Sequence, residues 1–184
     1  QQAEPALQGS AGVTVPGCAA PASVEIRCAV ESDVAAVCAF GAVVLPAHYT
    51  PLIGADAAQE LVTDWWSAPA TLRAVDAQAL WVALDADGEI VGVGELGHIG
   101  DDPVIYKLYI GAHRRGEGIG ALLIDRMIAT LAPRTPRVLI EHVAANDRAA
   151  AFYERHGFVV DHVDVIDPHA PERDVVWRAR ELAA

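Results

Sequence analysis

Long apolar runs and a secretion signal are both missing from this 184-residue chain. No stretch of eighteen or more consecutive apolar residues occurs, so the sequence predicts no membrane span. Its first residues lack a basic start followed by an apolar segment, so a secretory signal is not expected either.

Cysteine is scarce, and the spacing of the cysteines indicates no disulfide or metal-binding pair. The three cysteines, Cys18, Cys28 and Cys38, form no C-x-x-C pair and have no histidine ligands nearby. An odd number at this spacing argues against both a disulfide framework and a zinc site. We therefore expect a protein of the reducing cytoplasm that holds no metal.

Basic residues are few relative to acidic ones. Thirteen Lys and Arg against 25 Asp and Glu leave a formal charge of −12, which repels phosphate backbones. Nucleic acid is therefore not expected as a partner. The same field would mildly attract a cationic small molecule, although an acidic surface also simply keeps a protein soluble.

The chain divides into a leader and one domain. Residues 1–23 are rich in Ala, Gly, Pro and Gln without an apolar period, which is typical of a flexible leader. The rest, 24–184, has the length and the apolar content of a single domain with a real core.

Hydrophobic periodicity within the domain predicts a mixed α/β fold. Asp87-Gly88 between two β-rich runs indicates a hairpin, and Pro46 and Pro51 are expected to bracket a loop between the first two helices. The expected strands are 24–29, 81–85, 90–96, 104–110, 138–143, 158–165 and 174–180, and the expected helices are 32–44, 55–66, 121–131 and 146–156.

The most informative segment is a glycine-rich turn, residues 113–120, between a strand and a helix. Gly116, Gly118 and Gly120 let backbone N–H groups approach a ligand without Cβ atoms in the way. The start of the next helix adds unpaired N–H donors, which suits a pyrophosphate. Arg114 and its neighbour add positive charge, although a plain tight turn would also explain the glycines.

Other phosphate-binding motifs do not match this turn. A P-loop requires a lysine after its last glycine, and none follows Gly120. A dinucleotide-binding fingerprint requires a third glycine where Leu123 stands.

The segment 115–120 resembles the R-x-x-G-x-G/A signature of the GCN5-related N-acetyltransferases (GNAT family). The resemblance implies acetyl-CoA as cosubstrate, with its pyrophosphate on the amides of the turn and its pantetheine arm paired with the preceding strand. The cofactor-binding residues implied are Leu108, Tyr109, Ile110, Arg115, Gly116, Glu117, Gly118, Ile119 and Gly120.

A second block, residues 146–158, resembles the N-x-x-A-x-x-F-Y-x-x-x-G-F segment of the same family. Asn146 is a good helix N-cap, and in the family this asparagine also lies near the pantetheine. The resemblance implies that Tyr153 points its hydroxyl at the CoA sulfur and protonates the departing thiolate. A phenol with a pKa of about 10 is roughly matched to a thiol of about 8–9. The alternative for Tyr153 is a half-buried tyrosine whose hydroxyl meets water.

The general base is less clearly indicated. Many family members carry a carboxylate on the strand before the glycine turn, but residues 104–110 contain Lys107 and no acid. Glu95, Glu141 and His142 are candidates, and the last two point to opposite faces of one strand. Without a catalytic role, Glu95 would be a solvated strand end, Glu141 a salt-bridge partner and His142 a core residue. Bulk base acting through water is a further alternative.

The resemblance implies a GNAT-like acyl-CoA N-acyltransferase fold, with a mixed, mostly antiparallel central sheet flanked by helices. It also implies acetyl transfer to a primary amine of a small molecule through a ternary complex, in a V-shaped gap between strands 104–110 and 138–143. The alternatives are a catalytically silent CoA-binding sensor or scaffold, and a peptide or protein N-acetyltransferase. No membrane partner is expected, and a homodimer is left open. The acceptor pocket is expected from His48, Tyr49, Thr50, Leu52, Trp65 and Trp66.

Overall fold

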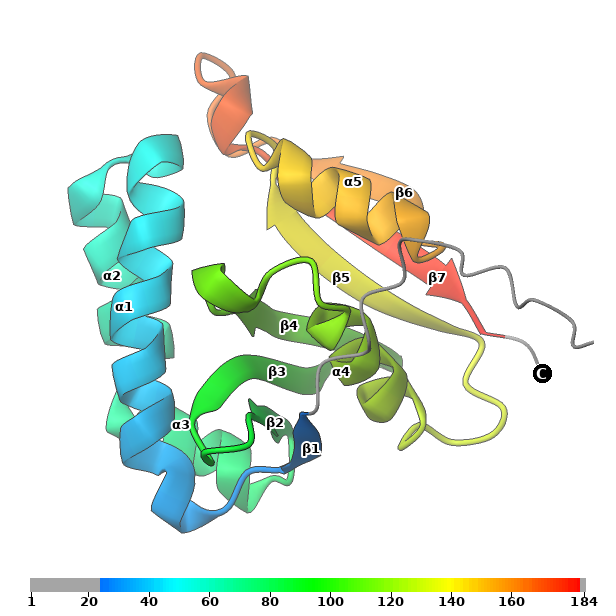
Figure 1. Cartoon of the computed structure of the whole chain (residues 1–184). Helices are drawn as coiled ribbons and strands as arrows, with labels where there is room; N and C mark the ends of the chain where they lie inside the picture. The colour runs from blue at the N-terminus through cyan, green and yellow to red at the C-terminus, as the bar shows by residue number, and fades with distance from the viewer. Residues whose placement is uncertain (1–23, 183–184) are drawn as a thin grey trace, which may run out of the picture.

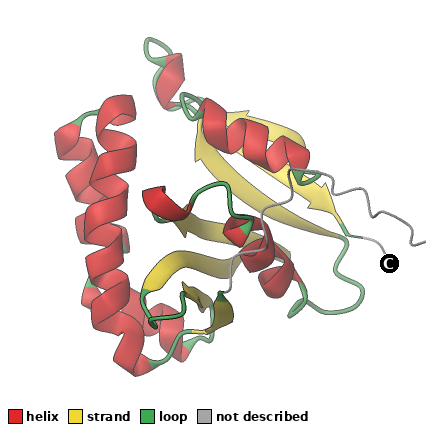
Figure 2. Ribbon diagram, viewed as in Figure 1, coloured by secondary structure: helices red, strands yellow, loops and turns green. Residues whose placement is uncertain are grey.

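A computed structural model describes residues 24–182, which form one sheet flanked by helices (Figures 1 and 2). The sheet has the strand order β1-β2-β3-β4-β5-β7-β6. Its strands are β1 (Glu25–Cys28), β2 (Leu80–Leu84), β3 (Ile90–Ile99), β4 (Asp102–Ile110), β5 (Arg137–Val143), β6 (Val159–Asp164) and β7 (Val175–Glu181). The helices are α1 (Val34–Ile53), α2 (Ala55–Trp65), α3 (Ala68–Asp76), α4 (Ile119–Ile128) and α5 (Asp147–Arg155), with 3-10 turns η1 (Glu31–Asp33), η2 (Ala112–Arg114) and η3 (Pro171–Arg173).

The fold class predicted from the sequence is confirmed. Every strand pair in the sheet is antiparallel except β4 with β5. Two apolar clusters cover opposite faces of the sheet. One joins α1, α2 and α3 to β2 and β3, and the other joins α4 and α5 to the centre of the sheet.

The first helix is longer than predicted. The loop expected at 45–54 is wrong, because α1 continues through Pro46 and Pro51 to Ile53 and is capped by Gly54, whose φ is 89°. A proline removes one helical hydrogen bond and strains the preceding turn, so packing must outweigh it. Here Val37 and Leu45 are buried against the sheet, and a Cβ at Gly41 would lie 2.2 Å from a Trp66 ring atom.

The third helix, α3, was not predicted. Pro69 stands in the first turn of α3, where its missing N–H is not needed, so it is compatible with a new helix directly after α2.

One stretch of the described residues, Glu31–Ile53, is long and apolar enough by length and composition to cross a bilayer. The absence of a membrane span stays a prediction. Core helices of soluble proteins pass the same test, and this helix packs through Val37, Val44 and Leu45 against the rest of the domain.

Strands β4 and β5 separate at the centre of the sheet. They pair only at Val104 with Leu139 and at Ile105 with Ile140. The register of β4 against β3 shifts at the same place, so that Tyr106 is an extra residue in β4. A bulge of this kind bends a strand away from its neighbour. The expected V-shaped gap between the two strands is therefore present (Figure 1).

Candidate active site

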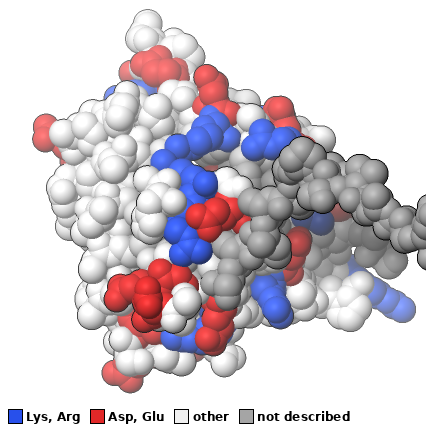
Figure 3. Space-filling model, viewed as in Figure 1, with Lys and Arg blue, Asp and Glu red and all other residues white. Residues whose placement is uncertain are grey.

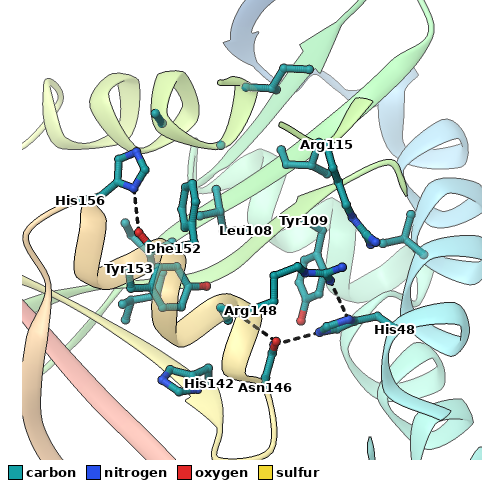
Figure 4. A pocket seen from close by; sticks show the side chains of 18 of the residues that line it. His48, Leu108, Tyr109, Arg115, His142, Asn146, Arg148, Phe152, Tyr153 and His156 are labelled. Carbon is teal, nitrogen blue, oxygen red and sulfur yellow. Dashed lines mark hydrogen bonds between the residues drawn. The ribbon is translucent and has the colours of Figure 1, made fainter. Parts of the chain in front are cut away.

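The gap between β4 and β5 opens into a cavity of about 390 Å³ (Figure 4). Its walls come from α1, β4, the glycine turn, the start of α4, β5 and α5. Most residues proposed from the sequence meet here, while Glu117 is not among the lining residues. Those that line it are Leu108, Tyr109, Ile110, Arg115, Gly116, Gly118, Ile119, Gly120, Glu141, Asn146 and Tyr153.

The glycine turn has a backbone that favours glycine. Gly116 and Gly118 have φ values of 84° and 83°, in the left-handed region that other residues adopt only at a cost. No other group lies within 4 Å of the position that a Cβ would take at either residue. Gly118 is also the N-cap of α4. The turn therefore presents unobstructed backbone and the first N–H groups of a helix to the cavity.

Gly120 serves a different purpose, which is close packing. A Cβ there would lie 3.0 Å from Cζ of Phe152, on α5. The absence of a side chain lets α4 and α5 approach each other beside the cavity.

Three arginines in the cavity wall, Arg115, Arg148 and Arg155, have no carboxylate partner among the described residues. Arg115 and Arg148 both line the cavity, and burial together with the charge of Arg148 lowers the pKa of Arg115. Arg114, in contrast, pairs with Glu117 at 2.9 Å and with Asp85 at 3.6 Å. Figure 3 shows basic side chains gathered along the middle of this face of an otherwise acidic protein. Uncompensated guanidinium groups in a cleft suit the oxygens of a phosphate.

Asn146 connects α5 to α1. Its Oδ1 accepts from the backbone N–H of Ala149 at 3.1 Å, which confirms the predicted N-cap. Its Nδ2 lies 2.9 Å from Nε2 of His48, and Nη2 of Arg148 lies 3.1 Å from Nδ1 of the same ring. His48 reaches this position only because α1 stays helical beyond Pro46.

The His48 ring is held in its neutral form. Burial first, and then the charges of Arg148 and Arg115, lower the pKa of His48 from 6.5 to about 4. Between those values the unfolded chain binds a proton that the folded chain does not. The contribution of His48 to the stability of the fold is thus fully present above about pH 6.5 and is lost as the pH falls toward 4.

We expect His48→Gln to flatten the loss of stability between pH 6.5 and 4. Glutamine keeps an acceptor for Asn146 but does not titrate. Urea unfolding of both proteins at stepwise pH measures the effect, and parallel curves for the two would show that His48 does not carry this dependence.

Tyr153 is buried in the α5 face of the sheet with only 7% of its surface exposed. Phe152, Phe158 and His142 surround its ring, with centroids 5.6, 5.9 and 5.8 Å away. Burial is the main cause that raises its pKa, so the phenol stays protonated at neutral pH. Tyr153 can therefore act as a proton donor inside the cavity, into which its hydroxyl points in Figure 4.

The two candidates for the general base on β5 differ in whether their hydrogen-bonding atoms are already engaged. Nδ1 of His142 lies 2.9 Å from the carbonyl of Val143, and its Nε2 accepts from Nε of Arg178 at 2.9 Å. Both of its nitrogens are occupied. Both residues line the cavity, but Glu141 has no hydrogen bond or ion pair with the described residues. Burial, helped by the charge of Asp164, raises the pKa of Glu141.

Glu95 lies apart from this cavity, contrary to the expectation that it could serve the site. It lines a separate, smaller cavity beside α2 and α3, and its carboxylate forms an ion pair with Lys107. These two residues face each other in the β3–β4 register. Lys107 is only 5% exposed, and a buried ammonium needs such a counter-charge.

Of the residues expected to form the acceptor pocket, only some line the main cavity. His48 and Tyr49 line the main cavity, whereas Thr50 and Leu52 do not. Of the two adjacent tryptophans, Trp66 is buried and Trp65 is 50% exposed beside the smaller cavity. No group of three or more potential metal ligands occurs within 24–182, where Cys28 and Cys38 are free thiols. Cys18 and the predicted leader lie outside the described residues.

Comparison with known proteins gives a consistent assignment. Residues 76–160 match the sequence model of the acetyltransferase (GNAT) domain. The PaiA N-acetyltransferase of Thermoplasma acidophilum, solved in complex with coenzyme A, is similar in fold with a TM-score of 0.73 at 18% identity, over 87% of this chain and 99% of that one. A GCN5-related N-acetyltransferase of Rhodopseudomonas palustris gives 0.73 at 17% identity, over 90% and 100%. Ard1 of Thermoplasma volcanium gives 0.66 at 18% identity, over 88% and 99%. Residues 76–160 therefore carry a GNAT acetyltransferase domain, and this match together with the shared fold supports an acyltransferase.

Proposed function

We propose that the protein transfers an acetyl group from acetyl-CoA to a primary amine of a small molecule within a ternary complex. The observation that carries the proposal is one continuous cavity that joins the glycine turn to Tyr153 and Glu141. It offers an anion-binding end, an unpaired strand edge, a proton donor and a free carboxylate.

The cofactor would follow β4. Its diphosphate would sit on the amides of residues 116–120, with Arg115 and Arg148 beside it. Beyond Ile105 the β5 side of β4 has no strand partner, so the backbone of Leu108, Tyr109 and Ile110 is free to pair with the pantetheine arm. Residues 106–110 span roughly 16 Å at about 3.3 Å per residue. The thioester would then lie where the strands meet.

The chemistry follows from that placement. The amine nitrogen attacks the thioester carbonyl, its bond to carbon forms and the carbon–sulfur bond breaks. Glu141 takes the proton from the nitrogen, and Tyr153 gives one to the sulfur. Much of the rate would come from orientation and carbonyl polarisation, so removal of the base alone should have a modest effect.

The proposal takes a small-molecule amine as the acceptor, with an N-terminal peptide as the competing class. The test is thiol release from acetyl-CoA with a panel of aliphatic amines, aromatic amines and N-terminal peptides. Turnover restricted to small amines supports the proposal. Peptide turnover alone, or CoA binding without any turnover, would replace it with a protein acetyltransferase or a silent CoA sensor.

We expect Glu141→Gln to lower kcat/KM about tenfold and to move the acidic limb of its pH profile, because this substitution removes the proton acceptor. Since burial raises the pKa of Glu141, that limb should lie above the ordinary range of a glutamate. Glu95→Gln is the comparison. If that substitution moves the limb and Glu141→Gln does not, the base is Glu95.

The homodimer and the cytoplasmic location remain proposals with separate support. Among the described residues, strand β6 is one of the two edges of the sheet, and Val159, Val160 and Val163 on it are about half exposed or more. Such an edge is able to pair with a second copy of the chain. Cys28 and Cys38 are free thiols, as a reducing compartment would keep them.

A further inference from the structure

Two tyrosine hydroxyls meet in the main cavity, one from α1 and one from β4. The oxygens of Tyr49 and Tyr109 are 3.1 Å apart, and both residues line the cavity that holds Glu141 and Tyr153. We propose that this pair binds the acceptor nitrogen and makes the enzyme select primary over secondary amines. The inference rests on the proposed acetyl transfer and adds to it the residues that determine the acceptor class.

The pair is held rigidly by the packing of α1 on the sheet. The Tyr109 ring meets the ring of Trp66 edge-on, with centroids 5.5 Å apart, and Trp66 in turn fills the space beside Gly41. The Tyr49 ring meets Tyr109 edge-on at 6.4 Å. Both phenols therefore stand at fixed positions on the α1 side of β4.

The two hydroxyls have hydrogen-bonding capacity to spare. Burial is the main cause that raises the pKa of Tyr49 and of Tyr109, so both carry their protons at neutral pH. Their mutual bond uses one O–H and one lone pair. Neither hydroxyl bonds any other described residue. Lone pairs on both oxygens, and one remaining O–H, are thus available to a ligand in the cavity.

An attacking amine needs such acceptors. Its lone pair must face the thioester carbon, so its N–H bonds point toward the walls of the site. A primary amine has two: one can meet the Glu141 carboxylate, and the other can meet the oxygen of the tyrosine pair. A secondary amine has a single N–H, which the base requires. Its extra alkyl group would then lie against the two phenols, leaving their remaining hydrogen-bonding capacity unused.

The test compares kcat/KM for an amine and its N-methyl derivative. Benzylamine and N-methylbenzylamine serve as probes, or the best primary amine of the panel with its N-methyl form. We expect the wild type to prefer the primary amine by about tenfold or more. Tyr49→Phe and Tyr109→Phe should each reduce that ratio at least about threefold, mainly through KM for the primary amine.

The controls separate this role from a structural one. CoA affinity and melting temperature should change little in Tyr49→Phe, because the ring and its packing remain. A purely structural defect would slow both amines equally and leave the ratio unchanged, which would overturn the inference while acetyl transfer itself stood. A wild type without amine turnover would overturn the proposed function, and the inference with it.

Discussion

Gly118→Val is expected to raise the dissociation constant of CoA at least about thirtyfold. Valine cannot hold the left-handed φ of 83° at this position without strain of about 2 kcal/mol. The turn would relax so that its amides leave the cavity, and binding would have to restore the strained form. Since 1.4 kcal/mol is a factor of ten, that cost alone is about thirtyfold. The valine methyl groups would also occupy the open space in front of the turn.

Gly88→Val is the matched control for this substitution. Gly88 has almost the same φ, 82°, and likewise no neighbour within 4 Å of a Cβ position, but it lies in the β2–β3 turn away from the cavity. We expect a similar loss of stability with normal CoA affinity by calorimetry. Undiminished affinity in Gly118→Val, or an equal loss in both variants, would contradict a diphosphate site at the glycine turn.

Tyr153→Phe is expected to lower kcat about a hundredfold, since general acid catalysis by one group contributes about 10²–10⁴. The ring keeps its packing against Phe152 and Phe158, and the lost hydroxyl bonds no described residue. The fold and the CoA affinity should therefore change little. Single-turnover measurements of thiol release compare the two proteins at the chemical step.

The pH dependence gives a second check on Tyr153. Because burial raises its pKa, the phenol should remain protonated throughout the neutral range. An acid with the pKa of a thiol would lose its proton near pH 8–9, and the rate would fall there. The wild type should show no such loss of rate from Tyr153. Equal single-turnover rates for wild type and Tyr153→Phe would remove the tyrosine from the mechanism.

Local signals in the sequence were enough for the glycine turn and for the helix that carries Tyr153. The glycine turn and the side-chain cap at Asn146 are properties of a few adjacent residues. The cap occurs as expected, and the structure adds a positive φ at Gly118. The Asp87-Gly88 hairpin was predicted on the same basis. Alternating apolar patterns located the strands, although their ends differ by up to three residues.

Features that depend on distant contacts could not be predicted in this way. The continuation of α1 through Pro46 depends on packing beyond the helix, including the contact of Trp66 with Gly41. The pairing of Glu95 with Lys107 depends on the register of β3 against β4, which sequence spacing does not determine. Arg148 stands at a variable position of the second motif, and only the structure brings it beside Arg115.

A structure of the protein with acetyl-CoA bound tests the central claim most directly. The account predicts the diphosphate on the amides of residues 116–120, the pantetheine along Leu108 to Ile110, and the sulfur within hydrogen-bonding distance of the Tyr153 hydroxyl. A diphosphate bound elsewhere, with the glycine turn empty in crystals that contain excess cofactor, would contradict it.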